Sequence, residues 1–227
     1  DMDTAAERLA GAVMSGELVA VFGDYDVDGA TSSALLKRFL ESVGGRARVY
    51  IPDRMTEGYG PNTPALRRLK EEGASVVFTV DCGTTAFDQL EDAAAQGLDV
   101  IVADHHEAEP RLPRALAVVN PNRIDETGTF GHLAAVGVVF LLIVAINRQL
   151  RVAGWFGQGR TEPDLMGWLD LVALGTVCDV VPLRGLNRAF VTQGLKVMGR
   201  RTNPGLAALS DVAKLSERPS AWHAGYL

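Results

Sequence analysis

Cysteine, net positive charge and long apolar runs are all scarce in this 227-residue sequence. Its two cysteines, Cys82 and Cys178, cannot form a disulfide framework, and neither has the spacing to another cysteine that zinc sites use. The longest apolar runs, such as 134–146, are short and interrupted by glycine, so we expect no membrane span. The acidic N-terminus does not resemble a signal peptide. We therefore expect a protein of the reducing cytoplasm.

The chain also lacks an excess of positive charge. Asp and Glu exceed Lys and Arg by 28 to 22, which gives a formal net charge of −6. Proteins that bind nucleic acid usually carry a basic surface, so the bulk charge argues mildly against such a role. That argument weakens if some carboxylates hold metal ions, because the ions would offset them. With 47% apolar and 22% charged residues, the composition is that of an ordinary globular protein.

The first part of the chain repeats an order of apolar strand, polar loop and helix. This order predicts an α/β fold, with about five strands in a mainly parallel sheet flanked by helices. The strands are short, continuous apolar runs, as expected for a sheet that is covered on both faces. We expect strands at 18–23, 46–51, 76–80, 98–103 and 115–119, and helices at 3–15, 30–43, 63–72 and up to residue 96.

The pattern becomes helical after residue 132. We therefore divide the chain into an α/β core at 1–132 and a helical extension of the same domain at 133–227. The residues at 154–163, which are rich in glycine, indicate an exposed connector. The expected helices of the extension lie at 133–152, 164–175, 186–199 and 203–214.

Three aspartates, Asp24, Asp26 and Asp28, follow the first predicted strand at alternate positions. One interpretation is a solvated acidic turn, since Asp and Gly are common in turns. The other is a divalent-cation site, because three crowded carboxylates repel one another and cations with oxygen ligands would compensate. In extended backbone, residues i and i+2 point to the same side, so Asp26 and Asp28 could reach two neighbouring ions.

Other strand ends carry the same kind of residue. Asp81 follows the third strand, and Asp104, His105 and His106 follow the fourth. Because the carboxyl ends of parallel strands meet at one edge of the sheet, these side chains should converge. Carboxylate and imidazole together suit Mn²⁺, Mg²⁺, Zn²⁺ or Fe²⁺, and imidazole favours Mn²⁺ or a mixed site. A carboxylate that bridges two ions is expected, and Asp81 is placed for it.

Asp179 stands inside a long apolar run and is a further candidate. It could instead cap the helix that begins later, just as His105 and His106 could belong to a surface turn. These separate explanations require several strand ends to coincide by chance, which favours one shared site. Three arginines near the motif loops, Arg54, Arg123 and Arg184, could bind phosphates, although surface solvation explains them as well.

Four segments of the sequence resemble the ordered motifs of the DHH phosphoesterase superfamily. Within it, they are most similar to the RecJ family of bacterial 5′→3′ single-stranded-DNA exonucleases, and the similarity covers nearly the whole chain. The Asp-His-His motif alone would be weak, whereas four motifs in order are specific. The segments are Gly23–Ala30, Val80–Thr84, Asp104–His106 and Gly175–Leu183.

This resemblance implies a two-metal phosphodiesterase that uses Mn²⁺ or Mg²⁺ and acts on single-stranded DNA. It places the protein in the bacterial cytoplasm, in DNA repair and recombination, with a single-strand-binding protein and a helicase as partners. It also implies a ligand set: Asp26 and Asp81 would hold one ion, and Asp28, Asp81, His105 and Asp179 the other. His106 would contact the scissile phosphate, and Asp24 would lie close to the ions.

The sequence also departs from the family. Ala135 stands where glycine is frequent, and the chain stops where the family continues into an arginine-bearing segment and further DNA-gripping domains. We therefore expect a catalytic domain with weak processivity. Alternative functions are a related phosphoesterase acting on oligoribonucleotides or cyclic dinucleotides, and an inactive nucleic-acid-associated scaffold. A receiver domain would explain the clustered aspartates but not His105 or Asp179.

Overall fold

The structure, a computed structural model, describes residues 1–157, 159–215 and 217–226. One sequence expectation extends beyond these residues, because Gln158 belongs to the predicted connector at 154–163. Gln158, Ser216 and Leu227 lie outside the described residues.

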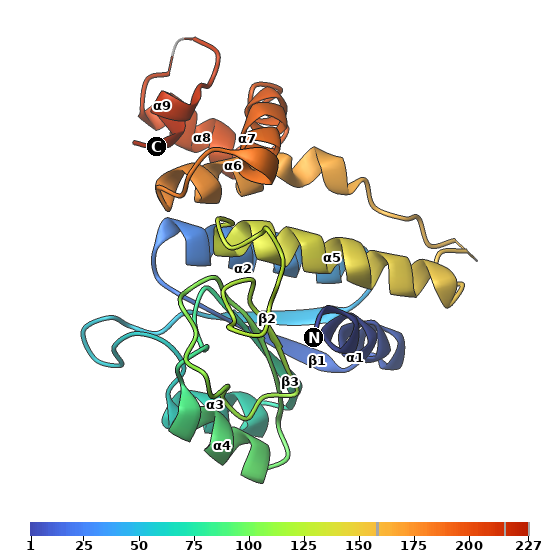
Figure 1. Ribbon diagram of the computed structural model, residues 1–227. Coiled ribbons are helices and arrows are strands. Elements are labelled where there is room, and N and C mark those ends of the chain that lie inside the picture. The colour runs from blue at the N-terminus through green and yellow to red at the C-terminus, as the bar shows by residue number, and fades with distance from the viewer. Residues whose placement is uncertain (158, 216, 227) are drawn as a thin grey trace.

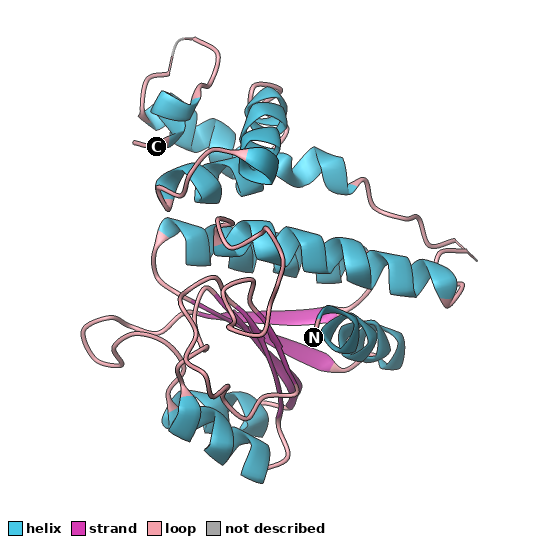
Figure 2. Cartoon of the chain, in the orientation of Figure 1, coloured by secondary structure: helices cyan, strands magenta, loops and turns pink. Residues whose placement is uncertain are grey.

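A parallel sheet forms the centre of the molecule (Figure 2), and every neighbouring pair of its five strands is parallel. The predicted five-stranded α/β fold is confirmed, with shorter strands at three places. In spatial order the strands are β2 (Arg46–Tyr50), β1 (Leu18–Gly23), β3 (Ala74–Val80), β4 (Asp99–Ala103) and β5 (Ala117–Val119).

Helices cover both faces of the sheet, which explains why the strands are continuous apolar runs. Successive residues of β3 point to opposite sides: Phe78 packs in one hydrophobic cluster and Val77 in the other. Figure 1 shows the two helical layers on either side of the strands. One layer contains α1 (Met2–Ser15), α2 (Val27–Ser42) and α5 (Ala135–Val152), and the other contains α3 (Thr63–Glu71) and α4 (Phe87–Ala95).

The C-terminal helices stack on the α2–α5 layer as a further layer (Figure 1). Phe140 of α5 and Phe190 of α7 meet edge to face, with ring centroids 5.3 Å apart. One hydrophobic cluster runs from α1 through α5 to this layer, so the helical extension shares its core with the α/β part. The layer consists of a 3₁₀ turn (Leu165–Trp168), α6 (Leu169–Cys178), α7 (Gly185–Met198), α8 (Pro204–Val212) and α9 (Ala221–Ala224).

Helix α5 is long and apolar enough to cross a membrane by length and composition alone. In this structure 61% of its apolar window is buried, and α5 packs against α1, α2 and α6. Its composition therefore reflects a helix at the centre of the core.

The strand order places a topological switch point between β1 and β3. From β1 the chain passes to β2 on one side, and β3 then returns to the other side of β1. In open α/β sheets, ligands bind at the carboxyl ends of the strands at such a point. Asp24 follows β1 and Asp81 follows β3, so both flank it.

Candidate metal centre

The acidic loop after β1 is shorter than predicted, because α2 begins at Val27 and not near residue 30. Asp26 is the N-cap, and its Oδ1 accepts a hydrogen bond from Gly29 N at 2.9 Å. Asp28 lies in the first helical turn, so the expected extended geometry for Asp26 and Asp28 is wrong. Asp26 still lies with Asp24 and Asp81, and Asp28 lies with His105 and Asp179. Both positions suit carboxylates, because acidic side chains are favoured at a helix N-terminus.

The Asp28 side chain lies between the N-terminal ends of α2 and α5. Its carboxylate accepts hydrogen bonds from Ala135 N at 2.6 Å and Val136 N at 2.9 Å, at the beginning of α5. The side chain is almost fully buried, at 1% exposure. Burial, followed by the nearby Asp81 carboxylate, raises the pKa of Asp28 to about 8.

Asp81 occupies an unusual backbone conformation at the end of β3, with φ at 61°. A non-glycine residue in this region needs support from its surroundings. Tyr59 supplies it, because its hydroxyl donates to the Asp81 carbonyl at 3.0 Å. Burial, and then the Asp26 carboxylate, raises the pKa of Asp81 to about 9.

His105 lies between two carboxylates from distant parts of the chain. Its Nε2 is 3.3 Å from Asp81 Oδ1, and its Nδ1 is 3.7 Å from Asp179 Oδ2. The imidazole is only 13% exposed, so His105 does not belong to a surface turn.

Asp179 follows the last residue of α6 and does not cap α7, where Arg184 takes the N-cap position. A carboxylate is disfavoured at the C-terminal end of a helix, which carries partial negative charge. Burial raises the pKa of Asp179. Both effects make a neighbouring cation favourable at this position.

His106 has a different environment from His105. Its ring is half exposed, and Nδ1 lies 2.7 Å from Asp104 Oδ1. Burial alone would raise the pKa of Asp104, but the hydrogen bonds from His106 and Thr84 hold it well below its usual range. Asp104 thus fixes the imidazole so that Nε2 remains available to a ligand.

A buried polar network that sequence reasoning missed positions both histidines. Asn120, after β5, donates to His106 O at 2.8 Å and to Thr84 Oγ1 at 2.9 Å. Asn122 donates to the His105 carbonyl. The Asn-Pro-Asn sequence after the fifth strand was the available signal, because a polar pair at one more strand end belongs to the same sheet edge.

The side chains form three groups, and the possible ligand atoms within each group lie within 4.8 Å of one another. Among the described residues, three buried carboxylate oxygens have no hydrogen-bond partner: Asp24 Oδ1, Asp81 Oδ1 and Asp179 Oδ2. Unpaired buried oxygens are costly, and divalent cations would satisfy them, so the residues fit metal ions. The groups are Asp24–Asp26–Asp81, Asp28–His105–Asp179 and Asp81–His105–His106.

Close packing beneath the centre depends on Gly175 of α6. A Cβ atom there would lie 2.3 Å from Thr31 Oγ1 and 2.9 Å from Asp28 Oδ1. Only glycine allows α6 to approach α2 this closely without displacing the carboxylate.

Two of the three predicted phosphate-binding arginines, Arg54 and Arg123, have different surroundings. Arg54 is exposed, with its guanidinium 5.1 Å from the ring centroid of Tyr25, beside the acidic loop. Arg123 is only 9% exposed, and its guanidinium binds Asp1, Asp125 and the Val118 carbonyl. Arg123 thus stabilises the end of β5 in this structure.

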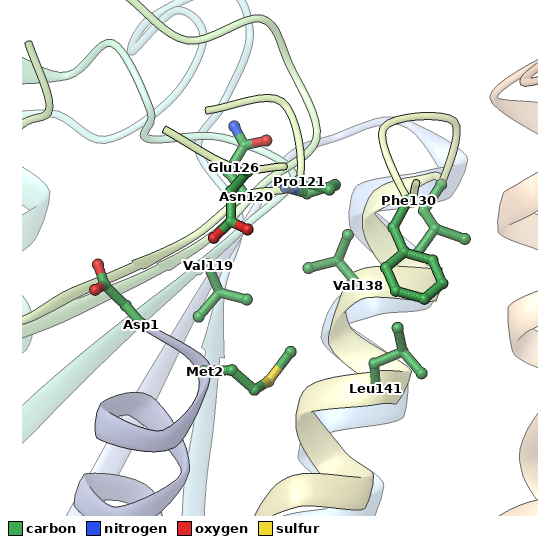
Figure 3. A pocket seen from close by; sticks show the side chains of 10 residues that line it. Asp1, Met2, Val119, Asn120, Pro121, Glu126, Phe130, Val138 and Leu141 are labelled. Atoms are coloured by element: carbon green, nitrogen blue, oxygen red, sulfur yellow. The ribbon is translucent and has the colours of Figure 1, made fainter. Parts of the chain in front are cut away.

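A cavity of about 160 Å³ lies between the start of α1 and α5 (Figure 3). Met2, Val138 and Leu141 give it a largely apolar wall, and Phe130 covers one side. This lining is unsuited to metal ions and places Phe130 in a cavity outside the acid–histidine cluster. Asn120 borders this cavity and also binds the His106 carbonyl.

Comparison with known proteins agrees with this geometry. Residues 18–176 match the model of the DHH family, N-terminal domain. The chain belongs to the DHH family. It is 42% identical over 212 residues to the single-stranded-DNA-specific exonuclease RecJ of Dickeya dadantii, an alignment covering 92% of this chain and 37% of that protein.

Solved structures show the same relationship. An exonuclease RecJ bound to manganese superposes with a TM-score of 0.85 at 33% identity, covering 99% of this chain and 54% of that one. RecJ from Thermus thermophilus in complex with Mn²⁺ gives a TM-score of 0.78 at 32% identity, covering 99% and 31%. The chain therefore spans about a third of the length of the curated relative and about half or less of these solved chains.

Proposed function

We propose that this chain is the catalytic domain of a two-metal phosphodiesterase that hydrolyses single-stranded DNA from the 5′ end. The observation that carries the proposal is that three buried carboxylate oxygens without a hydrogen bond, in residues that follow β1, β3 and α6, belong to neighbouring groups linked by Asp81 and His105. Membership of the DHH family and the likeness to manganese-bound RecJ support it. Activity in repair and recombination, a bacterial cytoplasmic location, and partnership with a single-strand-binding protein and a helicase belong to the same proposal.

The residues divide between two ions, Mn²⁺ or Mg²⁺. Asp24, Asp26 and Asp81 would hold one, and Asp28, His105 and Asp179 the other. Asp81 is also close to His105, so its carboxylate can be shared between both ions, as the sequence predicts. Asp24 enters this set through its buried, unpaired Oδ1.

Two ions held by these residues would lower the pKa of water and offset the charge that develops on the phosphoryl group. The protein's own residues provide position and electrostatics. Asp104 would orient His106 toward the substrate phosphate through its hydrogen bond to the imidazole. Asn120 fixes the backbone of His106 by donating to its carbonyl oxygen. Tyr59 maintains the Asp81 backbone, and Arg54 at the rim would pair with a phosphate.

Replacement of Asp81 by Asn tests the proposal, because Asn keeps the volume but removes the charge. The protein is incubated with Mn²⁺ and end-labelled single-stranded DNA, RNA or small dinucleotides. We expect the wild type to consume single-stranded DNA and D81N to lose Mn²⁺ binding and at least about 10³-fold in rate.

Asp170→Asn is the matched control. Asp170 is another buried aspartate of the chain, at 1% exposure, but it bonds to Leu171 N and lies outside the three groups. D170N should keep metal binding and activity. An active, metal-replete D81N protein would contradict the role of Asp81, and preferential cleavage of small dinucleotides would favour the alternative function.

A further inference from the structure

The charge of the chain is unevenly distributed around α7. No Asp or Glu occurs between Asp179 and Asp211, although the whole chain is acidic. The same interval contains five cations: Arg184, Arg188, Lys196, Arg200 and Arg201. A segment with one sign of charge in an oppositely charged protein indicates a surface for a charged partner.

Four of these cations form a stripe along α7 and its two ends, hereafter the basic stripe. Arg188 and Lys196 lie within α7, Arg184 is its N-cap, and Arg200 follows its C-cap Gly199. They occur at steps of four residues, with Thr192 at the step between, so they follow one ridge of the helix surface. All of them are exposed. At 1.5 Å per residue the stripe is about 24 Å long. The packed side of α7 is buried through Asn187, Phe190, Val191, Gly194 and Val197.

The basic stripe is not neutralised within the described part of the chain. Arg201 binds Asp211, whereas no ion pair is formed by the four cations of the stripe in the described residues. Like charges four residues apart on a helix repel each other. A stripe of this kind is therefore stabilised when an external polyanion binds.

A groove of about 600 Å³ adjoins the far half of the stripe. It lies between α7 and residues 218–221, where Arg218 adds a further cation. None of the described residues that line it is acidic. The nearest acid in sequence, Glu217, is bound to His223, which in turn holds Ser220 N. The groove is lined by Thr192, Leu195, Lys196, Gly199, Arg200, Arg218, Pro219, Ser220 and Ala221.

Exposed aromatic side chains follow directly after the groove wall. Trp222 is 74% exposed and Tyr226 is 51% exposed, with ring centroids 4.8 Å apart. Trp222 lies in α9, which packs against the end of α6, where Cys178 Sγ donates to the Ala224 carbonyl at 3.2 Å. Cys178 directly precedes Asp179, so α9 contacts the end of α6 that is followed by this aspartate.

We propose that the basic stripe, the groove and Trp222 form a track for the sugar–phosphate backbone and bases of a single-stranded nucleic acid that leads to the metal centre. This inference rests on the proposed function, because it assigns the surface that holds the strand being cut. Arg184 is five residues after Asp179, so their Cα atoms are within about 18 Å by chain length. The track therefore begins within that distance of Asp179.

Single-stranded nucleic acid fits this surface better than other polyanions. Proteins that bind single strands combine a basic groove along the backbone with aromatic rings on which bases stack. An acidic peptide would use the cations but would gain little from an exposed indole. Helix α7, which borders the groove, belongs to the helical layer farthest from α3 and α4 (Figure 1).

A binding experiment with the metal-free protein tests the track. Fluorescence anisotropy of a labelled oligothymidylate of about 20 nucleotides is measured in EDTA over a range of salt concentrations. We expect Lys196→Gln/Arg200→Gln to bind about 10- to 100-fold more weakly at about 50 mM salt, and its salt slope to fall by about 1.4. Trp222→Ala should weaken binding at least about fivefold.

Lys70→Gln/Arg148→Gln is the matched control, because it removes one lysine and one arginine that are also exposed but lie on α3 and α5. This control should bind like the wild type. Equal affinity of K196Q/R200Q and the control would overturn the track, as would displacement of the oligonucleotide by polyglutamate at the same charge concentration. A wild type that binds through this surface without cutting DNA would instead contradict the proposed function and leave the track supported.

Discussion

The acidic metal centre and the basic stripe differ in how the chain builds them. The centre brings together carboxylates from β1, β3 and α6, and buries most of them. The stripe comes from one helix, and its cations are exposed. Buried like charges require a compensating partner, whereas exposed charges destabilise the folded protein only slightly. We therefore assign catalysis to the acidic centre and binding of the nucleic-acid strand to the basic stripe. Four changes test this division of roles.

Gly175→Ala should have the largest effect on metal binding, because residue 175 of α6 packs directly against Asp28 of the acidic centre. The added Cβ would meet Asp28 Oδ1 at 2.9 Å and displace it. We expect loss of the ion at Asp28, His105 and Asp179 and destabilisation by about 1–3 kcal/mol. Isothermal titration with Mn²⁺ should detect one site instead of two.

Gly11→Ala is the control for this change. Gly11 lies inside α1, and a Cβ there has nothing within 4 Å. Because Ala is a better helix former, G11A should stabilise the protein by about 0.5–1 kcal/mol and leave both Mn²⁺ sites intact. Two unchanged sites in G175A would show that the contact does not define Asp28.

Asn120→Ala should have the next largest effect. It removes the hydrogen bonds to the His106 carbonyl and to Thr84 but no proposed metal ligand. Residues that support metal ligands typically contribute about 10- to 100-fold to affinity or activity. We expect a rate decrease of about that size in single-stranded DNA cleavage, with oligonucleotide affinity in EDTA unchanged. If N120A lost oligonucleotide affinity by the same factor as cleavage rate, the assignment of catalysis and strand binding to different regions would be contradicted.

Proton binding at the acidic centre should make stability depend on pH. The pKa of Asp28 is raised to about 8 and that of Asp81 to about 9, so the folded protein keeps protons that the unfolded chain releases near pH ~4. In EDTA, the free energy of unfolding should therefore fall as pH rises from about 4 to about 9. Mn²⁺ binds the deprotonated carboxylates, so the increase in Tm that it causes should grow with pH. A metal-free Tm that rises over this range would contradict the assignment.

Arg123→Gln should have the smallest effect on strand binding. Its guanidinium is engaged with Asp1 and Asp125, so little of it is available to a phosphate. We expect less than about a twofold change in oligonucleotide affinity, compared with about tenfold for Arg54→Gln. Equal, large losses in both variants would restore Arg123 as a substrate-binding residue.

Much of the fold follows from the sequence, because continuous apolar strands separated by amphipathic helices permit few arrangements. The start of α2 was mispredicted: the helix was expected from residue 30, but Asp26 acts as the N-cap and α2 begins at Val27. The candidate site residues could be selected because parallel strand ends converge. Contacts such as Tyr59 with Asp81, and Asn120 with His106, depend on where loops fold back, which local pattern does not determine.

The basic stripe could have been found from the sequence but was obscured by the net charge of −6. The informative quantity was local: four cations at steps of four residues in a stretch without acids. The function of the stripe could not be proposed without the structure, because the fold places Arg218 across the groove from α7 and leaves the following Trp222 exposed.

The most direct test of the metal centre is anomalous X-ray scattering from crystals of this chain soaked in Mn²⁺. We predict two manganese peaks, one bounded by Asp24, Asp26 and Asp81 and the other by Asp28, His105 and Asp179, with a separation of about 3.5–4 Å. No peak, or manganese only at sites away from Asp81 and His105, would contradict the account.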